Sequence, residues 1–287
     1  MGDRIERVGV VGGGQMGGGI AEVAARAGCD VVVVEVSDER AAASRDAIAA
    51  SLDRAAAKGK LSEADRDAAL ARLQVVSDYA ALADREIVIE AVVESEEEKL
   101  RVFAELDRTV RDQDAILASN TSSIPIARLA SATQRPDHVL GMHFFNPVPV
   151  LRLVELIPSL RTDDAVAARA EAFATEVLGK RVIRCPDRAG FVVNVLLVPY
   201  LLSAIRLYEQ GFATAEDIDT GMVEGCNHPM GPLRLTDLIG LDTIKAVAES
   251  LYEEFRDPAF ATPPLLARMV DAGFLGRKSG RGFYDYS

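Results

Sequence analysis

His143 and Glu155 stand at the two ends of an apolar run, HFFNPVPVLRLVE, in a chain that contains three histidines. The Leu-Val and Leu-Ile pairs that flank Glu155 favour burial, and a buried carboxylate usually requires a partner. Histidine is the residue type best suited to accept a proton near neutral pH, and a carboxylate bonded to its second nitrogen fixes the tautomer. The two residues therefore predict general acid–base chemistry, provided that their strands are adjacent. A histidine satisfied within the core is the structural alternative.

A glycine-rich turn supplies a second element of chemistry. Gly12-x-Gly14-x-x-Gly17 follows the apolar run VGVVG directly and opens an alanine-rich helical run. Such a turn lets a pyrophosphate approach the backbone, and the helix N-terminus offers free N–H groups and positive charge. The next apolar run ends at Glu35, whose carboxylate would accept from the adenosine ribose hydroxyls and repel a 2′-phosphate. The pattern predicts an NAD site and makes NADP the less favoured cofactor; a ligand-free turn is the alternative.

These two elements fit one reaction. A nicotinamide cofactor accepts a hydride from a carbinol carbon, and the protein must supply the base that takes the hydroxyl proton. Together, the glycine turn and the histidine–glutamate pair predict an oxidoreductase.

The elements that must position these residues form an alternating pattern up to about residue 186. Short β-branched runs are separated by alanine-rich helical runs, which predicts a parallel sheet with helices on both faces. Strands are expected at 8–12, 31–36, 74–78, 87–93, 115–119, 139–145, 153–157 and 181–185, and helices at 15–27, 38–58, 63–72, 96–110 and 164–178. The two helices between the second and third strands predict a helical hairpin, with a capping box at Ser62-x-x-Asp65.

Beyond about residue 189 the pattern is helical, with helices expected at 191–210, 214–225, 235–255 and 263–273. The predicted fold class is α/β: a Rossmann-like, mostly parallel, doubly wound sheet with an inserted helical hairpin, followed by a smaller all-α domain. The expected domains are 1–187, which includes the hairpin at about 38–73, and 188–287. The apolar run 189–205 is interrupted by polar residues and proline, so it predicts a helix in a core or subunit interface rather than a membrane span.

Composition narrows the function classes. The 287 residues are 49% hydrophobic and 26% charged, with a net charge of −12. This acidic balance disfavours binding to nucleic acid and to anionic membranes. Cys29, Cys185 and Cys226 are widely separated, so neither a metal centre nor a disulfide framework is expected. The start of the chain lacks the pattern of a signal peptide, and we expect a cytoplasmic protein.

Seven stretches, spread over nearly the whole length of the chain, resemble the short-chain L-3-hydroxyacyl-CoA dehydrogenases. They are VVGGGQMGGGIA, IVIEAVVESEEEK, ASNTSSIPI, GMHFFNPVPVLRLVELI, DRAGFVVNVLLVPYLLSAIRLYEQG, HPMGPLRLTDLIGLDT and GRKSGRGFY. The resemblance implies reversible, NAD-dependent oxidation of an (S)-3-hydroxyacyl-CoA, with 3-hydroxybutyryl-CoA as the expected substrate. It implies that His143 is the general base, Glu155 its orienting acid, and Ser122 a hydrogen-bonding partner of the substrate oxygen. Asn194 matches a residue that holds the substrate.

The resemblance also implies contacts to the cofactor and to coenzyme A. The residues that match cofactor-side positions are Gly12, Gly14, Gln15, Met16, Gly17, Glu35, Glu94, Lys99, Ser119, Asn146 and Lys278. Ser51 and Lys58, on the helical hairpin, match contacts to the coenzyme A portion. The family further implies a homodimer formed through the helical domain.

Several alternatives stay open at this level. Ser122 or Ser123 could simply cap the helix that follows, Asn194 could have a structural partner, and Lys58 could be a solvated charge. L-gulonate dehydrogenase and its relatives share the glycine turn and the histidine–glutamate pair. A non-catalytic NAD-binding protein is the alternative from another class.

Overall fold

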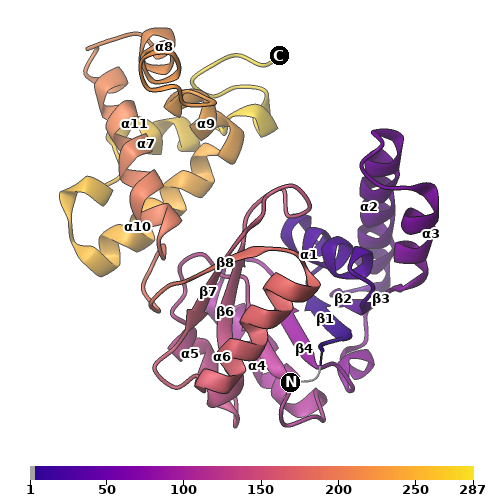
Figure 1. Ribbon diagram of the computed structural model, residues 1–287. Helices are drawn as coiled ribbons and strands as arrows, with labels where there is room; N and C mark the ends of the chain where they lie inside the picture. Colours follow the sequence, from indigo (N-terminus) through magenta and orange to yellow (C-terminus); the bar gives the residue numbers. More distant parts are fainter. Residues whose placement is uncertain (1–3) are drawn as a thin grey trace. The chain divides into compact units, whose positions relative to one another are not determined.

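The computed structural model describes residues 4–287, so the first three residues of the expected N-terminal domain lie outside the described part. The chain divides into two compact units, with the boundary between Arg188 and Ala189. The first unit is an α/β structure and the second is helical (Figure 1). Each unit is described by itself.

One eight-stranded sheet forms the centre of the first unit, with strand order β3-β2-β1-β4-β5-β6-β7-β8. Neighbouring strands are parallel except β6 and β7, which pair antiparallel. The strands are β1 Arg7–Val11, β2 Asp30–Val34, β3 Leu73–Val76, β4 Ile87–Glu90, β5 Ile116–Ser119, β6 Val139–Phe144, β7 Leu153–Pro158 and β8 Arg181–Arg184. Each expected strand is therefore present, with bounds shifted by a few residues at most, and the predicted fold class is confirmed.

Helices cover the sheet because its strands are apolar on both faces. In β2, Val31 to Val34 are all buried, as is usual for a strand covered on both sides. The helices of this unit are α1 Gln15–Arg26, α2 Asp38–Ala57, α3 Glu63–Ala71, α4 Glu96–Thr109, α5 Ile126–Ala130 and α6 Asp164–Ala172. The expected helix 164–178 is α-helical only to Ala172 and continues as a π-helical turn, Phe173–Val177.

The helical hairpin consists of α2 and α3, which lie side by side beside β2 and β3 (Figure 1). Ser37 caps α2 by accepting a hydrogen bond from Arg40 N at 3.2 Å. Ser62 caps α3 by accepting a hydrogen bond from Asp65 N at 3.0 Å, and its hydroxyl donates to the Asp65 carboxylate at 2.6 Å, so the two residues expected to form a capping box contact each other. Both helix starts are therefore determined by local sequence.

The second unit contains α7 Val193–Glu209, α8 Ala215–Cys226, α9 Pro232–Ile239, α10 Leu241–Phe255 and α11 Pro264–Asp271. The prediction of a single helix over 235–255 is wrong. The segment forms two helices, α9 and α10, and the first begins earlier than expected, at Pro232. They are separated at Gly240, whose φ of +107° is incompatible with a continuous right-handed helix. Between residues 4 and 287, none of the helices combines the length and the apolar character needed to cross a bilayer.

Candidate functional site

The glycine turn lies at the carboxyl end of β1, where the central strands of a doubly wound sheet open toward a ligand. Gly14 is the N-cap of α1 and supplies no capping side chain, so the first N–H groups of the helix remain available to an anion. A Cβ on Gly17 would lie 1.8 Å from the carbonyl oxygen of Gly12, whereas one on Gly14 would meet nothing within 4 Å. Gly17 therefore permits close helix–strand packing, and Gly14 leaves open space for a ligand.

A cavity of about 910 Å³ adjoins this turn and is lined by Gln15, Met16 and Glu35 as well as by residues of α4. Glu35 follows β2 directly and is buried, and its carboxylate accepts a hydrogen bond from Gly13 N at 2.8 Å. The acid predicted to contact ribose is thus tied to the turn predicted to hold pyrophosphate. These features fit a dinucleotide.

Sheet register brings His143 and Glu155 together. β6 and β7 are antiparallel neighbours, and these two residues are direct partners across the pair. Directly opposed side chains lie on the same face of a sheet, and His143 Nδ1 lies 2.7 Å from Glu155 Oε2. Glu155 is fully buried and His143 is 5% exposed. The condition attached to the pair, that its strands be adjacent, is met.

The direction of this hydrogen bond determines the state of the imidazole. A carboxylate can only accept, so the hydrogen lies on Nδ1 and the neutral ring presents its lone pair at Nε2. Ser122 Oγ lies 3.2 Å from that Nε2. The thiol of Cys185 also donates to Glu155, at 3.8 Å from Oε1. The arrangement can accept a proton at Nε2 and stabilise the resulting charge through Glu155.

Ser122 belongs to the loop that follows β5, and it does not cap the next helix. The N-cap of α5 is Pro125, and the Asp187 carboxylate instead accepts hydrogen bonds from Ile126 N and Ala127 N at 2.8 and 2.9 Å. The capping alternative for Ser122 and Ser123 is therefore wrong. The side chain of Ser122 is available for another role.

Three residues expected on the cofactor side, Glu94, Lys99 and Ser119, form a connected polar group around Glu90. Lys99 and Ser119 are buried, and both contact the Glu90 carboxylate, at 2.6 and 2.7 Å. Glu94 lies 3.3 Å from Lys99 and is 41% exposed. Burial acts to raise the pKa of Glu94, but the Lys99 ammonium and hydrogen bonds from Thr121 and Ser122 hold that pKa below its ordinary value. Sequence reasoning missed Glu90.

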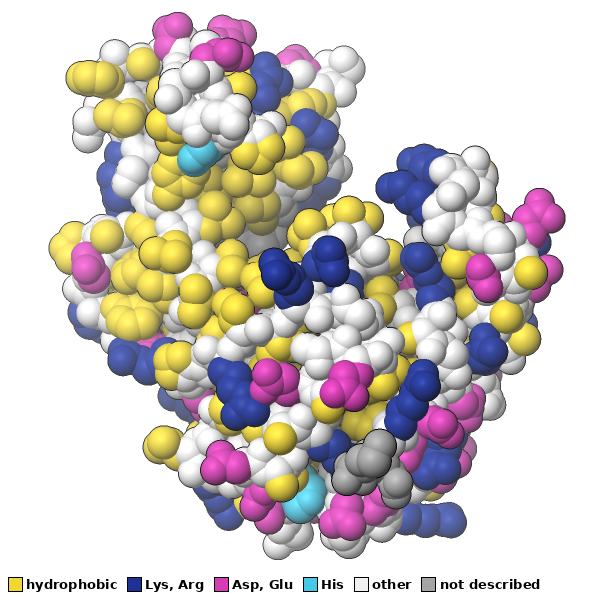
Figure 2. All heavy atoms as spheres, in the orientation of Figure 1, with side chains coloured by type: hydrophobic (Ala, Val, Ile, Leu, Met, Phe, Trp, Pro, Cys, Tyr) yellow, Lys and Arg dark blue, Asp and Glu magenta, His cyan; other side chains and the backbone are white. Residues whose placement is uncertain are grey.

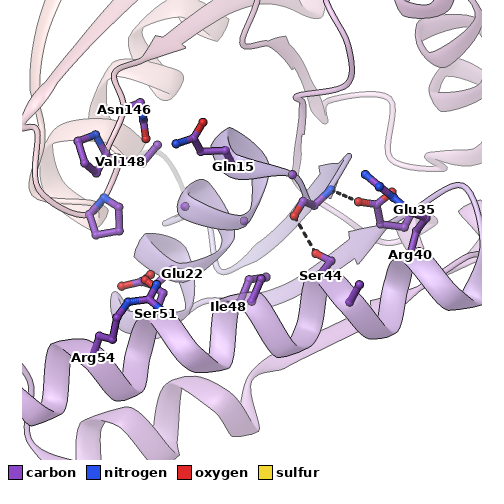
Figure 3. Close-up of a pocket in the computed structure, with 18 residues that line it drawn as sticks. Gln15, Glu22, Glu35, Arg40, Ser44, Ile48, Ser51, Arg54, Asn146 and Val148 are labelled. Carbon is purple, nitrogen blue, oxygen red and sulfur yellow. Dashed lines mark hydrogen bonds between the residues drawn. The ribbon is translucent and has the colours of Figure 1, made fainter. Parts of the chain in front are cut away.

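A second cavity, of about 420 Å³, lies between α1, α2 and the loop after β6 (Figure 3). Ser51 and Asn146 line it, whereas Lys58 is an exposed residue at the end of α2 and is not part of its lining. Arg40 and Arg54 also line this cavity and were missed. The signal was present: positions 40, 44, 47, 51 and 54 recur every three or four residues and share one helix face.

Two expected site residues, Asn194 and Lys278, belong to the helical unit. Asn194 lies in the first turn of α7, and its backbone N–H donates to the Gly190 carbonyl at 3.1 Å. Lys278 Nζ lies 2.6 Å from Asp242 Oδ2. Ser122, His143 and Glu155 are thus brought together within the first unit. Among residues 4–287, no group of three or more His, Cys, Asp or Glu side chains is suited to hold a metal ion.

A dinucleotide turn combined with a buried histidine–glutamate pair, on a Rossmann-like unit followed by a helical one, defines a nicotinamide-dependent dehydrogenase. Residues 7–188 match the family model described as 3-hydroxyacyl-CoA dehydrogenase, NAD binding domain. Residues 190–286 match the model described as 3-hydroxyacyl-CoA dehydrogenase, C-terminal domain. The chain belongs to the 3-hydroxyacyl-CoA dehydrogenase family.

Individual relatives agree with this assignment. A 3-hydroxybutyryl-CoA dehydrogenase of Mycobacterium tuberculosis is 62% identical over 286 residues, which cover 100% of both chains. The crystal structure of M. tuberculosis FadB2 aligns with a TM-score of 0.98, at 62% identity, covering 99% of this chain and 100% of that one. The (S)-3-hydroxybutyryl-CoA dehydrogenase PaaH1 of Ralstonia eutropha aligns with a TM-score of 0.94, at 48% identity, covering 99% of each chain.

Proposed function

We propose that the chain catalyses the reversible, NAD-dependent oxidation of (S)-3-hydroxyacyl-CoA to 3-oxoacyl-CoA, with 3-hydroxybutyryl-CoA as substrate. The observation that carries this proposal is the line of contacts from Ser122 Oγ through His143 to Glu155, at 3.2 and 2.7 Å. Ser122 and His143 lie near the carboxyl ends of β5 and β6, on the same side of the sheet as the glycine turn at the carboxyl end of β1. The family and the named activities of the relatives support the same reaction.

In this reaction His143 Nε2 takes the proton of the substrate hydroxyl while Ser122 holds the substrate oxygen. NAD, when bound, would accept the hydride that leaves C3 of the substrate. Glu155 keeps the ring in the accepting tautomer and stabilises the imidazolium once the proton arrives, and its complete burial strengthens that interaction. Because neutral imidazole is the accepting form, oxidation is expected to become faster as the pH rises from mildly acidic to mildly alkaline.

The test is turnover of acetoacetyl-CoA, followed through the absorbance of NADH. His143→Gln should lose about 10²–10⁴-fold in kcat, the value of positioned acid–base catalysis, while still binding NADH. His138→Gln is the matched control: His138 precedes β6 at the opposite end from His143 and lies 3.3 Å from Asp137. Full turnover by His143→Gln would overturn the assignment. Turnover of L-gulonate in place of acetoacetyl-CoA would favour the free-acid alternative, and NADH binding without turnover the non-catalytic one.

Preference for NAD over NADP forms part of the proposal. Glu35 is buried beside the turn, and a 2′-phosphate there would face its carboxylate. Arg40 lines the same cavity from the first turn of α2 and is drawn beside Glu35 in Figure 3. Glu35→Ser should therefore raise kcat/KM with NADPH relative to NADH, and adding Arg40→Ala should reverse much of the gain. An unchanged cofactor ratio in Glu35→Ser would contradict this preference.

We also propose that the cavity beside α2 receives the coenzyme A portion of the substrate. Ser51 and Arg54 line it, and a guanidinium is suited to bind phosphate. Arg54→Ala should raise KM for acetoacetyl-CoA with little change in kcat. Arg45→Ala is the control, because Arg45 is exposed on the same helix, α2, and does not line that cavity. The contact predicted between Lys58 and coenzyme A is tested in the same way: Lys58→Ala should raise KM for acetoacetyl-CoA relative to the control variant.

The helical unit is proposed to form the homodimer, and its residues Asn194 and Lys278 are proposed to bind the substrate and the cofactor respectively. It exposes several large apolar side chains, and hydrophobic atoms gather on its visible face (Figure 2). Those more than a third exposed are Val192, Leu196, Leu207, Phe212, Leu238 and Tyr252. Such a surface is typical of an association site. Leu196→Asp should shift the mass measured by light scattering from dimer to monomer; a wild-type monomer would contradict the proposal.

A further inference from the structure

Glu90 is a fully buried carboxylate at the carboxyl end of β4 that the reaction described above does not use. Its Oε1 accepts hydrogen bonds from Lys99 Nζ at 2.6 Å and from Val92 N at 2.7 Å. Its Oε2 accepts from the hydroxyl of Ser119 at 2.7 Å. Glu90 and Ser119 are register partners, so this single carboxylate joins the ends of two neighbouring strands.

Lys99 carries the charge that allows Glu90 to be buried. Its side chain is 1% exposed, and its ammonium lies between two carboxylates: Glu90 on β4 and, at 3.3 Å, Glu94 on the following loop. Removing one member of such a pair leaves a buried charge without compensation, whereas replacing both with neutral residues of similar size can leave stability unchanged. This difference makes it possible to separate a positioning role from a role in folding.

Glu94 in turn accepts hydrogen bonds from the loop after β5. Its Oε1 accepts hydrogen bonds from the Thr121 hydroxyl at 2.5 Å, from Ser122 N at 2.9 Å and from Ser123 N at 3.2 Å. The same loop is held at its start, where Thr121 N donates to Ser119 Oγ at 3.2 Å. The backbone of residues 122 and 123 is therefore bonded to Glu94 directly, and that of Thr121 is connected to Glu90 through the Ser119 hydroxyl; both carboxylates contact Lys99.

We propose that the buried Glu90–Lys99 pair is a positioning device for the proton-transfer site. The pair fixes Glu94, Glu94 fixes residues 121–123, and this loop keeps Ser122 Oγ within hydrogen-bond reach of His143. Glu90 is thereby a positioning residue, and Lys99 acts here through Glu94 rather than through an exposed surface of its own. The inference rests on the proposed function, because Ser122 and His143 must serve the reaction for their spacing to matter.

The test is a double-mutant cycle between the pair and Ser122. Glu90→Gln with Lys99→Met removes both charges, keeps the glutamine able to hydrogen-bond Val92 and Ser119, and should still fold, because Glu94, which loses its ammonium partner, is 41% exposed to water. A misplacement on the order of 1 Å costs up to about 10²-fold in rate, so kcat with acetoacetyl-CoA should fall about 10–100-fold. In a Ser122→Ala background, the same double substitution should cost less than about 3-fold, because the group it positions is absent.

A second ion pair, between Asp107 on α4 and Arg135 after α5, provides the matched control. Asp107 and Arg135 lie 3.0 Å apart and are largely buried, away from the 121–123 loop contacts. Replacing them with Asn and Met should lower the melting temperature, and any loss in kcat should be the same whether or not Ser122 is present. If Glu90→Gln/Lys99→Met fails to fold, Ser119→Ala replaces it; a loss in kcat that disappears in Ser122→Ala is again the expected result.

Any of three results would overturn the positioning role. The first is a kcat within about 3-fold of wild type in the folded Glu90→Gln/Lys99→Met variant. The second is a loss in kcat that is the same with and without the Ser122→Ala substitution, and the third, where Ser119→Ala is used instead, is wild-type activity in that variant. An active wild-type enzyme with any of these results contradicts the positioning role alone. A wild-type protein without turnover contradicts the proposed function and this inference together.

Discussion

Glu155→Gln is the substitution that most directly tests the proton-accepting site. Glutamine has nearly the same shape, so the fold should be retained, but its amide presents either an NH₂ or a carbonyl to His143 Nδ1. If the NH₂ faces Nδ1, the ring hydrogen moves to Nε2, and the atom 3.2 Å from Ser122 Oγ can no longer accept a proton. If the carbonyl faces Nδ1, the tautomer is retained but the charge that stabilises imidazolium is lost.

Either outcome removes much of what positioned acid–base catalysis supplies, about 10²–10⁴-fold in kcat, or ~3–5 kcal/mol of barrier. The upper part of that range is expected, because Glu155 is fully buried and its hydrogen bond to His143 is 2.7 Å long. The assay is kcat with acetoacetyl-CoA and NADH, with the melting temperature recorded alongside. Glu97→Gln is the control, since Glu97 is 74% exposed on α4.

A folded Glu155→Gln enzyme that retains more than about a third of wild-type kcat would refute the role of the pair. Loss of kcat accompanied by a large fall in melting temperature would instead assign Glu155 to folding. A change in the pH dependence of kcat, in a variant that melts normally, is the result that the proton-accepting role requires.

Three further predictions follow from the first unit. The depressed pKa of Glu94 contributes stability that is complete above its ordinary value of 4.5 and is lost as the pH falls through the lower folded value, so Glu94→Gln should flatten the acid side of melting temperature against pH. Gly17→Ala should prevent stable folding, which circular dichroism would detect, because its Cβ would meet the Gly12 carbonyl. Gly14→Ala should fold, since its φ of −64° suits alanine and nothing lies within 4 Å, yet NADH titration should show weaker binding.

The parts of the fold that the sequence predicted are those determined by local pattern. Apolar β-branched runs, capping residues and the glycine turn act over a few residues, so the eight strands and the α2–α3 hairpin could be located. The division of the helix expected at 235–255 could not, because it depends on the backbone of Gly240, and an isolated glycine is also tolerated within helices. The adjacency of β6 and β7 likewise required the three-dimensional sheet order.

Within the site, Glu155 and Glu90 share the same sequence feature. Both are single glutamates in short apolar runs, LVELI and IVIEAVV, and both are fully buried. For Glu155 a histidine stood near in the sequence, and the pair could be inferred. For Glu90 the partner, Lys99, lies beyond a turn and in a charged helical stretch that reads as solvated surface. Its burial, at 1% exposure, is what the sequence could not indicate.

The identity of each partner explains why two similar buried acids take different roles. The carboxylate of Glu90 faces an ammonium, which has only N–H donors and no lone pair, so this contact is suited to hold structure in place. The carboxylate of Glu155 faces an imidazole, whose second nitrogen can accept a proton, so that contact becomes stronger when a proton arrives. A lysine at position 143 would place an ammonium, which has no lone pair, where Nε2 now lies, so the site would have no proton acceptor, however well Glu155 were placed. The chemistry therefore depends on which acid of the sheet meets the titratable base.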